Sequence, residues 1–355
     1  MEKEAQAAHV AAQIAEVESR NSALAQIYDE IDGILAATLD VDDYVDLETL
    51  RATVEHPPFD RPDLEIPLPP PRPLPEPAEP TLQTPEQPKG VFGKKKKIAE
   101  LESAARLAFE SDHAAWLARM AELPALNQAE VDKHSAAESL RLDAVKVERD
   151  RYARECADRE REVAEQNAAI DILTASLGYG TVDAVQEYVS IVLSNSVYPD
   201  HFEVDYDFTY DPTTAELRLR CLVPNPDTLP DIKAFKYTKA SDEITTTSLS
   251  QKACKDRYAS AVHQVAIRSL HEIFEADRRG LISMISLEVG TDGTDPATGQ
   301  PLFVNFVAVA AQREAFDEFD LSAVIPAATL AHLGASVSKN PYAFEIANAS
   351  GIRQA

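Results

Sequence analysis

Two histidines and two glutamates lie close together in the sequence and are the residues best suited to hold a metal ion. His263 and His271 are eight residues apart, and Glu272 and Glu275 follow. Imidazole nitrogens and carboxylate oxygens are common zinc ligands, but the helical zinc motif is HExxH and the string here is HEIFE. Because no third ligand is evident, we expect these histidines to pack or to cap a helix, and we predict no metal site.

A second pattern matches the sequence motif of a metal-dependent nuclease. Such enzymes hold Mg²⁺ with carboxylates on adjacent strands, and a lysine orients or activates the attacking water. The dipeptide Pro199-Asp200 and the string DIK at 231–233 match that composition. Asp200 precedes an expected strand and Asp231 follows the proline-broken loop PNPDTLP, so the preferred interpretation is a chance match. A nuclease that uses Asp200, Asp231 and Lys233 stays open as an alternative.

Loops that cradle phosphates are not recognisable in the chain. It has none of the patterns GxxxxGK[ST], GxGxxG and GxSxG, and only 11 of its 355 residues are glycine. Such loops need glycine because the ligand approaches the backbone amides closely. The sequence therefore predicts no cofactor and no catalytic residue.

A cluster of basic residues is the best candidate for contact with nucleic acid. Six basic side chains fall within 25 residues: Lys233, Lys236, Lys239, Lys252, Lys255 and Arg257. Phe235, Tyr237 and Tyr258 are interleaved with them, and lysines attract phosphate while aromatic rings stack on exposed bases. Three acidic residues share the window, and the alternation along IKAFKYTKA is typical of any half-exposed strand. A solvated sheet face is therefore the alternative.

The overall charge confines any such contact to a local patch. The net charge is −26 and the sequence pI is about 4.6, so the molecule as a whole repels phosphate. A run of four lysines at 94–97 is a second candidate, although a short charge run is more typical of a solvated helix start.

Cysteine usage and the lack of long apolar runs indicate a cytoplasmic protein. Cys156, Cys221 and Cys254 are far apart and form no CxxC pair, which fits a reducing compartment. The start MEKEAQAAHV lacks the features of a signal peptide, and no stretch approaches the ~20 apolar residues that span a bilayer. We expect no membrane partner.

A repeating pattern near the N-terminus predicts a helix that associates with another helix. The residues at the repeating positions are Val10, Ile14, Val17, Asn21, Leu24, Tyr28, Ile31 and Leu35. If Val10 and Val17 occupy d positions of a coiled coil, Asn21 occupies an a position, where paired amides fix the register of a parallel dimer. The prediction is a homodimer, and packing of this helix on another helix of the same chain is the alternative.

The next segment is rich in proline. Thirteen of the 23 prolines fall in residues 57–88, and proline fixes φ and removes backbone donors. We expect a semi-extended linker without a core, with docking of PPPRP into an aromatic groove as the alternative.

A long helical region follows the linker, because the sequence from Ile98 to about Leu177 is rich in alanine, glutamate, arginine and leucine. Pro124 predicts a break that leaves either a helical hairpin or a kinked rod.

From Gly178 onward the pattern is mixed. It predicts a helix at 181–195, a strand hairpin within 202–223, a strand at 232–240, a helix at 251–279, a hairpin around TDGTDPATGQP and short helices near 326–333. The fold class is α+β: a long N-terminal helical and coiled-coil region, then an antiparallel sheet with packed helices. The expected divisions are a helical segment at 1–56, a linker at 57–93, helical arms at 94–177, an α+β domain at 178–345 and a tail at 346–355.

Several strings of this α+β region carry a resemblance to a known family. They are YPDHF (198–202), AFKYTKASDEIT (234–245), RYASAVHQVAIRSLHEIFEADRRG (257–280), DPATGQP (295–301) and LGASVSKNP (333–341). Together with the proline-rich stretch and GVFGKKKK, they resemble the region that precedes the nuclease domain in bacterial Mrr-type restriction endonucleases. In that family a PD-(D/E)xK nuclease follows, and its residues are missing from this sequence.

The resemblance implies a non-catalytic component of a restriction or phage-defence system. Its α+β domain is expected to bind DNA or a partner such as a nuclease subunit. The alternatives are an assembly protein unrelated to defence and the cryptic nuclease described above.

Overall fold

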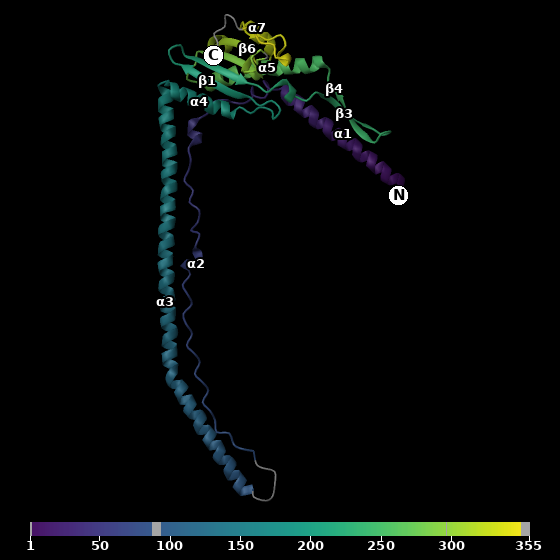
Figure 1. The fold of residues 1–355 in the computed structure, drawn as a ribbon. Coiled ribbons are helices and arrows are strands. Elements are labelled where there is room, and N and C mark those ends of the chain that lie inside the picture. Colours follow the sequence, from purple (N-terminus) through teal and green to yellow (C-terminus); the bar gives the residue numbers. More distant parts are fainter. Residues whose placement is uncertain (1, 87–93, 296, 349–355) are drawn as a thin grey trace. The chain divides into compact units, whose positions relative to one another are not determined.

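A computed structural model describes residues 2–86, 94–295 and 297–348 (Figure 1). The chain forms two compact units: a sheet unit of residues 1–51 and 166–355, and a strap unit of residues 52–165. The end of the expected linker, residues 87–93, and most of the expected tail, residues 349–355, lie outside the described ranges. None of the described helices combines the length and the apolar composition that a bilayer-spanning segment needs.

The strap unit is built on helix α3 (Lys94–Gly178), which continues into the sheet unit. Its 85 residues include Pro124, and Figure 1 shows the helix bending in its N-terminal part without interruption. Of the two predicted outcomes the kinked rod is therefore observed. Proline removes one hydrogen bond and clashes with the preceding turn, and a long helix absorbs this cost by bending.

The proline-rich segment is not a free linker, because its described residues lie along α3 (Figure 1). We call residues 52–86 the strap. The Tyr152 hydroxyl donates to the carbonyl of Pro57 at 2.7 Å, and the Trp116 indole N–H donates to the carbonyl of Pro77 at 2.9 Å. The strap therefore runs antiparallel to α3.

The spacing of these two contacts shows that the strap is extended. Pro57 and Pro77 are 20 residues apart, and their partners on α3 are 36 residues apart. At about 3.1 Å per residue for polyproline II and about 1.5 Å for an α-helix, the two spans are roughly 60 Å and roughly 54 Å. The single helical turn α2 (Pro62–Glu65) takes up most of the difference. One residue of the strap thus covers the same length as about two residues of α3.

Side chains of α3 accept hydrogen bonds from two backbone amides of the strap. The amide of Leu68 donates to Glu138 Oε2 at 3.1 Å, and the amide of Leu74 donates to Asn127 Oδ1 at 2.8 Å. The hydrogen bond from Arg141, followed by the one from the Leu68 amide, lowers the pKa of Glu138 to about 2. Polar contacts, and not an apolar core, therefore hold the strap on the helix.

The sheet unit contains a five-stranded sheet with the order β1-β2-β5-β6-β7. Its strands are β1 (Asp205–Asp211), β2 (Glu216–Leu222), β5 (Met284–Thr294), β6 (Pro301–Gln312) and β7 (Ser336–Val337). The β1–β2 and β5–β6 hairpins are antiparallel as predicted, but β2 and β5 pair in parallel. The expectation of an antiparallel sheet is therefore wrong, and the sheet is mixed. The long connection containing α5 (Gln251–Ala276) returns the chain to the starting end of the sheet, which a parallel pair requires.

Helices cover this sheet and join it to a separate ribbon. Helix α5 packs on β5, β6 and α7 (Pro326–His332), and α4 (Val182–Asn195) packs on β1 and α5. The ribbon consists of β3 (Ile232–Thr238) and β4 (Glu243–Ser248), and α1 (Glu2–Asp32) packs against both β3 and α5. Three short helical turns, η1 (Leu47–Leu50), η2 (Pro226–Thr228) and η3 (Pro341–Ala343), and α6 (Arg313–Phe316) complete the elements.

The N-terminal segment is part of the sheet unit and not a domain of its own. Ile31, Ile34, Leu35 and Leu47 belong to the same buried cluster as the sheet and α5. The expected division at residue 56 therefore differs from the observed one, because these apolar side chains find their partners more than a hundred residues away.

A buried ion pair connects three segments of the sheet unit. Arg268 and Glu272 on α5 are 4% and 1% exposed, and Arg268 Nε lies 2.6 Å from Glu272 Oε1. Arg268 also donates to the carbonyls of Ile34 and Val197, at 3.0 and 2.9 Å. The Ser196 hydroxyl donates to both oxygens of Glu272. The pair therefore fixes the segment after α1 and the segment after α4 onto α5.

We expect Glu272→Gln to lower the free energy of unfolding by about 3–5 kcal/mol, because Arg268 would keep its buried charge without a counter-ion. Urea denaturation of the full chain followed by circular dichroism measures this. Asp256→Asn removes an exposed pair with Lys252 on the same helix, and it should change the value by less than about 0.5 kcal/mol. Equal effects of the two substitutions would contradict a structural role for the buried pair.

Asn127→Ala should expose the amide of Leu74 to solvent exchange. Loss of one hydrogen bond of about 1 kcal/mol corresponds to exchange about fivefold faster at Leu74. Hydrogen–deuterium exchange resolves this, and the Leu68 amide, which Glu138 holds, should be unaffected. If the Leu74 amide already exchanges in wild-type protein at the rate of an unstructured peptide, the strap is not docked.

Candidate nucleic-acid interface

The β3–β4 ribbon carries half of the predicted basic cluster. Strands β3 and β4 are antiparallel, with Lys236 opposite Thr245 and an irregularity in register between Ile232 and Ala234. Lys233, Lys236 and Lys239 are all exposed. Among the described residues none of these three side chains forms an ion pair or a hydrogen bond that the structure gives. The ribbon therefore presents three lysines without an ion pair, Lys233 and Lys236 on β3 and Lys239 in the turn after it, and the exposed Asp242 and Glu243 lie at the same end of the ribbon as Lys239.

The hydroxyl groups of β4 lie beside these lysines. Thr245 donates to the carbonyl of Lys236 and Thr247 to that of Ala234, each at 3.2 Å. Residues 245–248 are exposed. Hydroxyl oxygens and lysine ammonium groups are both common contacts of phosphate oxygens, so the chemistry of this face suits a nucleic-acid backbone.

The other three predicted basic residues are engaged or partly buried elsewhere. Lys252 Nζ lies 2.5 Å from Asp256 on the same helix turn. Arg257 donates to both carboxylate oxygens of Asp32, at 2.9 and 3.1 Å, and its guanidinium lies 3.9 Å from the centre of the Tyr28 ring. Lys255 is half-buried. The structure thus assigns Arg257 to the contact between α5 and α1.

The interleaved aromatic residues do not form a stacking surface. Tyr258 is fully buried and donates to the carbonyl of Pro224. Phe235 is half-buried, with the Arg20 guanidinium 5.7 Å from its ring centre. The Tyr237 hydroxyl donates to Asp242 at 2.6 Å, and this hydrogen bond, with a further one from His9, lowers the pKa of the Asp242 carboxyl. The ribbon therefore offers phosphate attraction without base stacking.

Helix α1 holds the ribbon through the residue that was predicted to fix a dimer register. The Asn21 amide donates to the carbonyl of Phe235 at 3.0 Å, and its oxygen accepts from the amide of Phe235 at 2.8 Å. The Tyr28 hydroxyl donates to the carbonyl of Ile232 at 2.5 Å. Asn21 thus pairs with backbone groups of β3 much as a neighbouring strand would.

The predicted dimer seam of α1 is largely occupied within the chain. Leu24, Ile31 and Leu35 are buried in the sheet unit, while Val10, Val17 and Tyr28 are half-buried. Ile14 remains 40% exposed. This placement matches the alternative of intramolecular packing, although the observed partners include a strand as well as a helix. Self-association stays a prediction.

The three residues of the alternative nuclease site do not share a cavity. Asp200 lines a hollow between the end of α1 and the segment after α4, while Asp231 lines a different hollow beside Cys254 and Tyr342. Lys233 is exposed on the ribbon. These three residues therefore do not place two carboxylates and a lysine around a common point.

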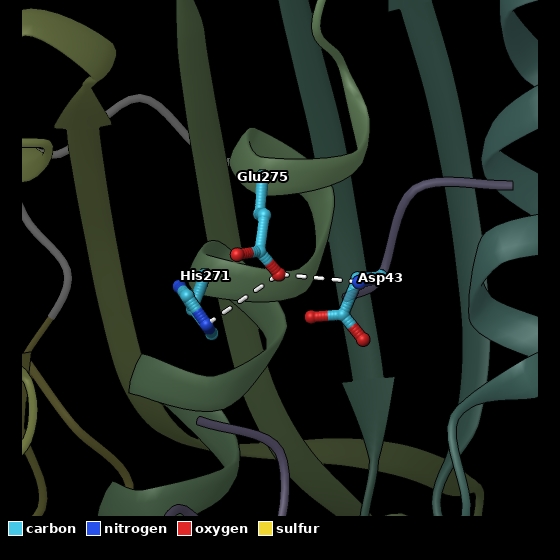
Figure 2. Close-up of side chains that lie close together, drawn as sticks. All are labelled: Asp43, His271 and Glu275. Atoms are coloured by element: carbon cyan, nitrogen blue, oxygen red, sulfur yellow. Dashed lines mark hydrogen bonds and ion pairs between the residues drawn. The ribbon is translucent and has the colours of Figure 1, made fainter. Parts of the chain in front are cut away.

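The two histidines of α5 have different surroundings. His263 Nε2 is buried without a hydrogen-bond partner among the described residues, and burial lowers the pKa of its imidazole. This agrees with a packed histidine. His271 instead lies beside Glu275 and Asp43 (Figure 2). Sequence reasoning missed Asp43 because it lies 228 residues before His271, and its only signal was the acidic string DVDDYVD at 40–46.

Comparison with known proteins adds no assignment: no family model, no curated protein and no solved structure matches the chain.

Asn21→Leu distinguishes the two roles considered for Asn21. In a coiled coil, leucine at this position would strengthen a dimer. In the observed structure, it leaves the amide and carbonyl of Phe235 unpaired, and we expect a loss of about 1–3 kcal/mol in unfolding free energy with no gain in mass. Urea denaturation and light scattering measure both. Ser19→Leu at an exposed position of the same helix is the control, and a heavier, more stable Asn21→Leu variant would contradict the intramolecular role.

Proposed function

We propose that this chain is a non-catalytic recognition component of a bacterial restriction or phage-defence system, acting in the cytoplasm, and that its β3–β4 ribbon contacts DNA. The observation that carries the proposal is the row of exposed lysines, Lys233, Lys236 and Lys239, beside the hydroxyl groups of β4. The string AFKYTKASDEIT, which forms most of this ribbon, is also among those that resemble the Mrr-type endonucleases.

A two-stranded ribbon is a suitable element for this task. The major groove of DNA admits either a helix or a two-stranded β-ribbon. Because the chain carries a net charge of −26, repulsion elsewhere restricts binding to this element and makes it weak and sensitive to salt. Stronger attachment to DNA then requires more than one copy or a partner, which fits the predicted dimer and a separate nuclease subunit.

A second candidate function is an assembly protein that binds another protein through α3. Leu140 and Val147, one heptad apart on α3, are 71% and 62% exposed. Contiguous apolar surface, in contrast to isolated apolar side chains, marks contact with another protein, and residues one heptad apart lie on the same side of a helix. This candidate predicts partner binding without any affinity for DNA.

Binding of the full chain to duplex and single-stranded DNA across a salt series tests the first proposal. Each phosphate contact contributes about −0.9 to the slope of log K against log salt for duplex DNA. We therefore expect the triple change Lys233→Gln, Lys236→Gln and Lys239→Gln to reduce the slope by up to about 3. The matched control changes Lys133, Lys146 and Lys339 to Gln, which are also exposed and belong to neither basic run.

The outcomes separate the candidates. A loss confined to the ribbon variant supports DNA contact by the ribbon, and an equal loss in the control variant refutes that assignment. Absence of any salt-sensitive binding by the wild-type chain would reject direct DNA contact and favour the assembly role.

A further inference from the structure

Three potential metal ligands from distant parts of the chain lie together in the sheet unit. They are Asp43, His271 and Glu275, and one ligand atom of each lies within 4.8 Å of the others. His271 Nε2 is 3.9 Å from Glu275 Oε2. Figure 2 shows His271 and Glu275 on successive turns of α5, with Asp43 facing them from the segment after α1.

The arrangement is held by its surroundings. A spacing of four residues places His271 and Glu275 on the same face of α5. Asp43 is positioned because its amide donates to Glu275 Oε2 at 3.2 Å, and because neighbouring Asp42 accepts from Arg278 at 2.6 Å. The Thr38 hydroxyl lies 3.4 Å from the Asp43 carboxylate.

The cluster has more negative charge than its neighbours neutralise. The carboxylates of Asp43 and Glu272 lie on either side of the Thr38 hydroxyl, at 3.4 and 3.2 Å from it, and Glu275 contacts the Asp43 amide. Two arginines lie nearby, and both are already paired: Arg268 with Glu272 and Arg278 with Asp42, each at 2.6 Å. Like charges at this separation repel, and a bound cation would relieve that repulsion.

The imidazole supplies an observation independent of the carboxylates. His271 Nε2 is buried and has no hydrogen-bond partner among the described residues. A buried nitrogen without a partner is uncommon in folded proteins, because it loses its bond to water without replacement. The same nitrogen lies 3.9 Å from Glu275 Oε2 in the cluster.

An open space adjoins the cluster. A cavity of about 520 Å³ is lined by His271 and Glu275, and by Asp317 and Asp320 from the segment after α6. It leaves room for water molecules to complete a coordination shell. It also places further carboxylates nearby.

We propose that Asp43, His271 and Glu275 bind a divalent transition-metal ion of the zinc type. One imidazole with two carboxylates favours such an ion over Mg²⁺ or Ca²⁺, which prefer oxygen ligands alone. Tetrahedral coordination with bonds of about 2.0–2.2 Å separates ligand atoms by about 3.3–3.6 Å. The 3.9 Å between His271 and Glu275, and separations of up to 4.8 Å within the cluster, therefore need side-chain adjustments of up to roughly 1.5 Å.

The ion would fasten two segments that are far apart in the sequence. Asp43 belongs to the segment between α1 and the strap, and the other two ligands belong to α5. The open side toward the cavity leaves coordination positions to water. The proposal is independent of DNA contact by the ribbon.

Titration of the metal-free full chain with Co²⁺, followed by visible absorption, tests the site. Coordination by nitrogen and oxygen gives d–d bands without the near-ultraviolet charge-transfer band of a cobalt–thiolate bond, so it is distinguished from binding at Cys156 or Cys254. We expect about one ion per chain, displaced by Zn²⁺. Glu275→Gln and His271→Ala should each weaken binding at least about tenfold.

Controls guard against misfolding and against adventitious surface binding. His201→Ala and Glu203→Gln remove exposed groups of the same types, and they should leave the titration unchanged. Melting temperatures of the metal-free variants report folding, and Zn²⁺ should raise the melting temperature of wild-type protein but not of Glu275→Gln. Equal binding by wild type and both ligand variants, or no binding by wild type, would overturn the proposal.

Discussion

The buried pair of Arg268 and Glu272 is the interaction on which the sheet unit depends. Removing two charges from water is costly, and the cost is offset here because each charged group also has neutral hydrogen-bond partners. Those partners come from the segments after α1 and after α4. The ion pair therefore fixes the positions of these two segments against α5. Because Glu272 engages Arg268, no ion pair of Arg268 with Asp43 is present among the described residues.

The strap unit depends on a different constraint, which is the scarcity of backbone donors in a proline-rich segment. A chain with few amide groups can lie on a helix without a sheet partner, because few of its groups lose hydrogen bonds to water. Two of the amides that remain, those of Leu68 and Leu74, donate to Glu138 and Asn127. Docking thus relies on matched polar contacts at intervals and requires no apolar core.

Local sequence patterns predicted the helices and strands better than they predicted which of these elements pack or pair with one another. Helices α4 and α5 and both hairpins were predicted because apolar periodicity is a property of each segment alone. The parallel pairing of β2 with β5 was not, since it depends on the path of the intervening chain. The candidate site shows the same division. The lysines of β3 were identified from composition, but the engagement of Arg257 with Asp32, the bonding of Asn21 to Phe235 and the approach of Asp43 to His271 all join residues over two hundred positions apart.

The unequal rise of strap and helix limits how the strap unit can change in length. Deleting one strap residue would move every later contact by about two positions on α3, which is about 200° around the helix axis. The amide of Leu74 would then face away from Asn127. The contacting side chains of α3 face the strap again only after a whole number of helical turns. A deletion of about seven residues from α3, which is about two turns, must therefore be matched by a deletion of three or four residues from the strap. Insertions and deletions in related chains would therefore occur in coordinated pairs, one on each side of residues 87–93.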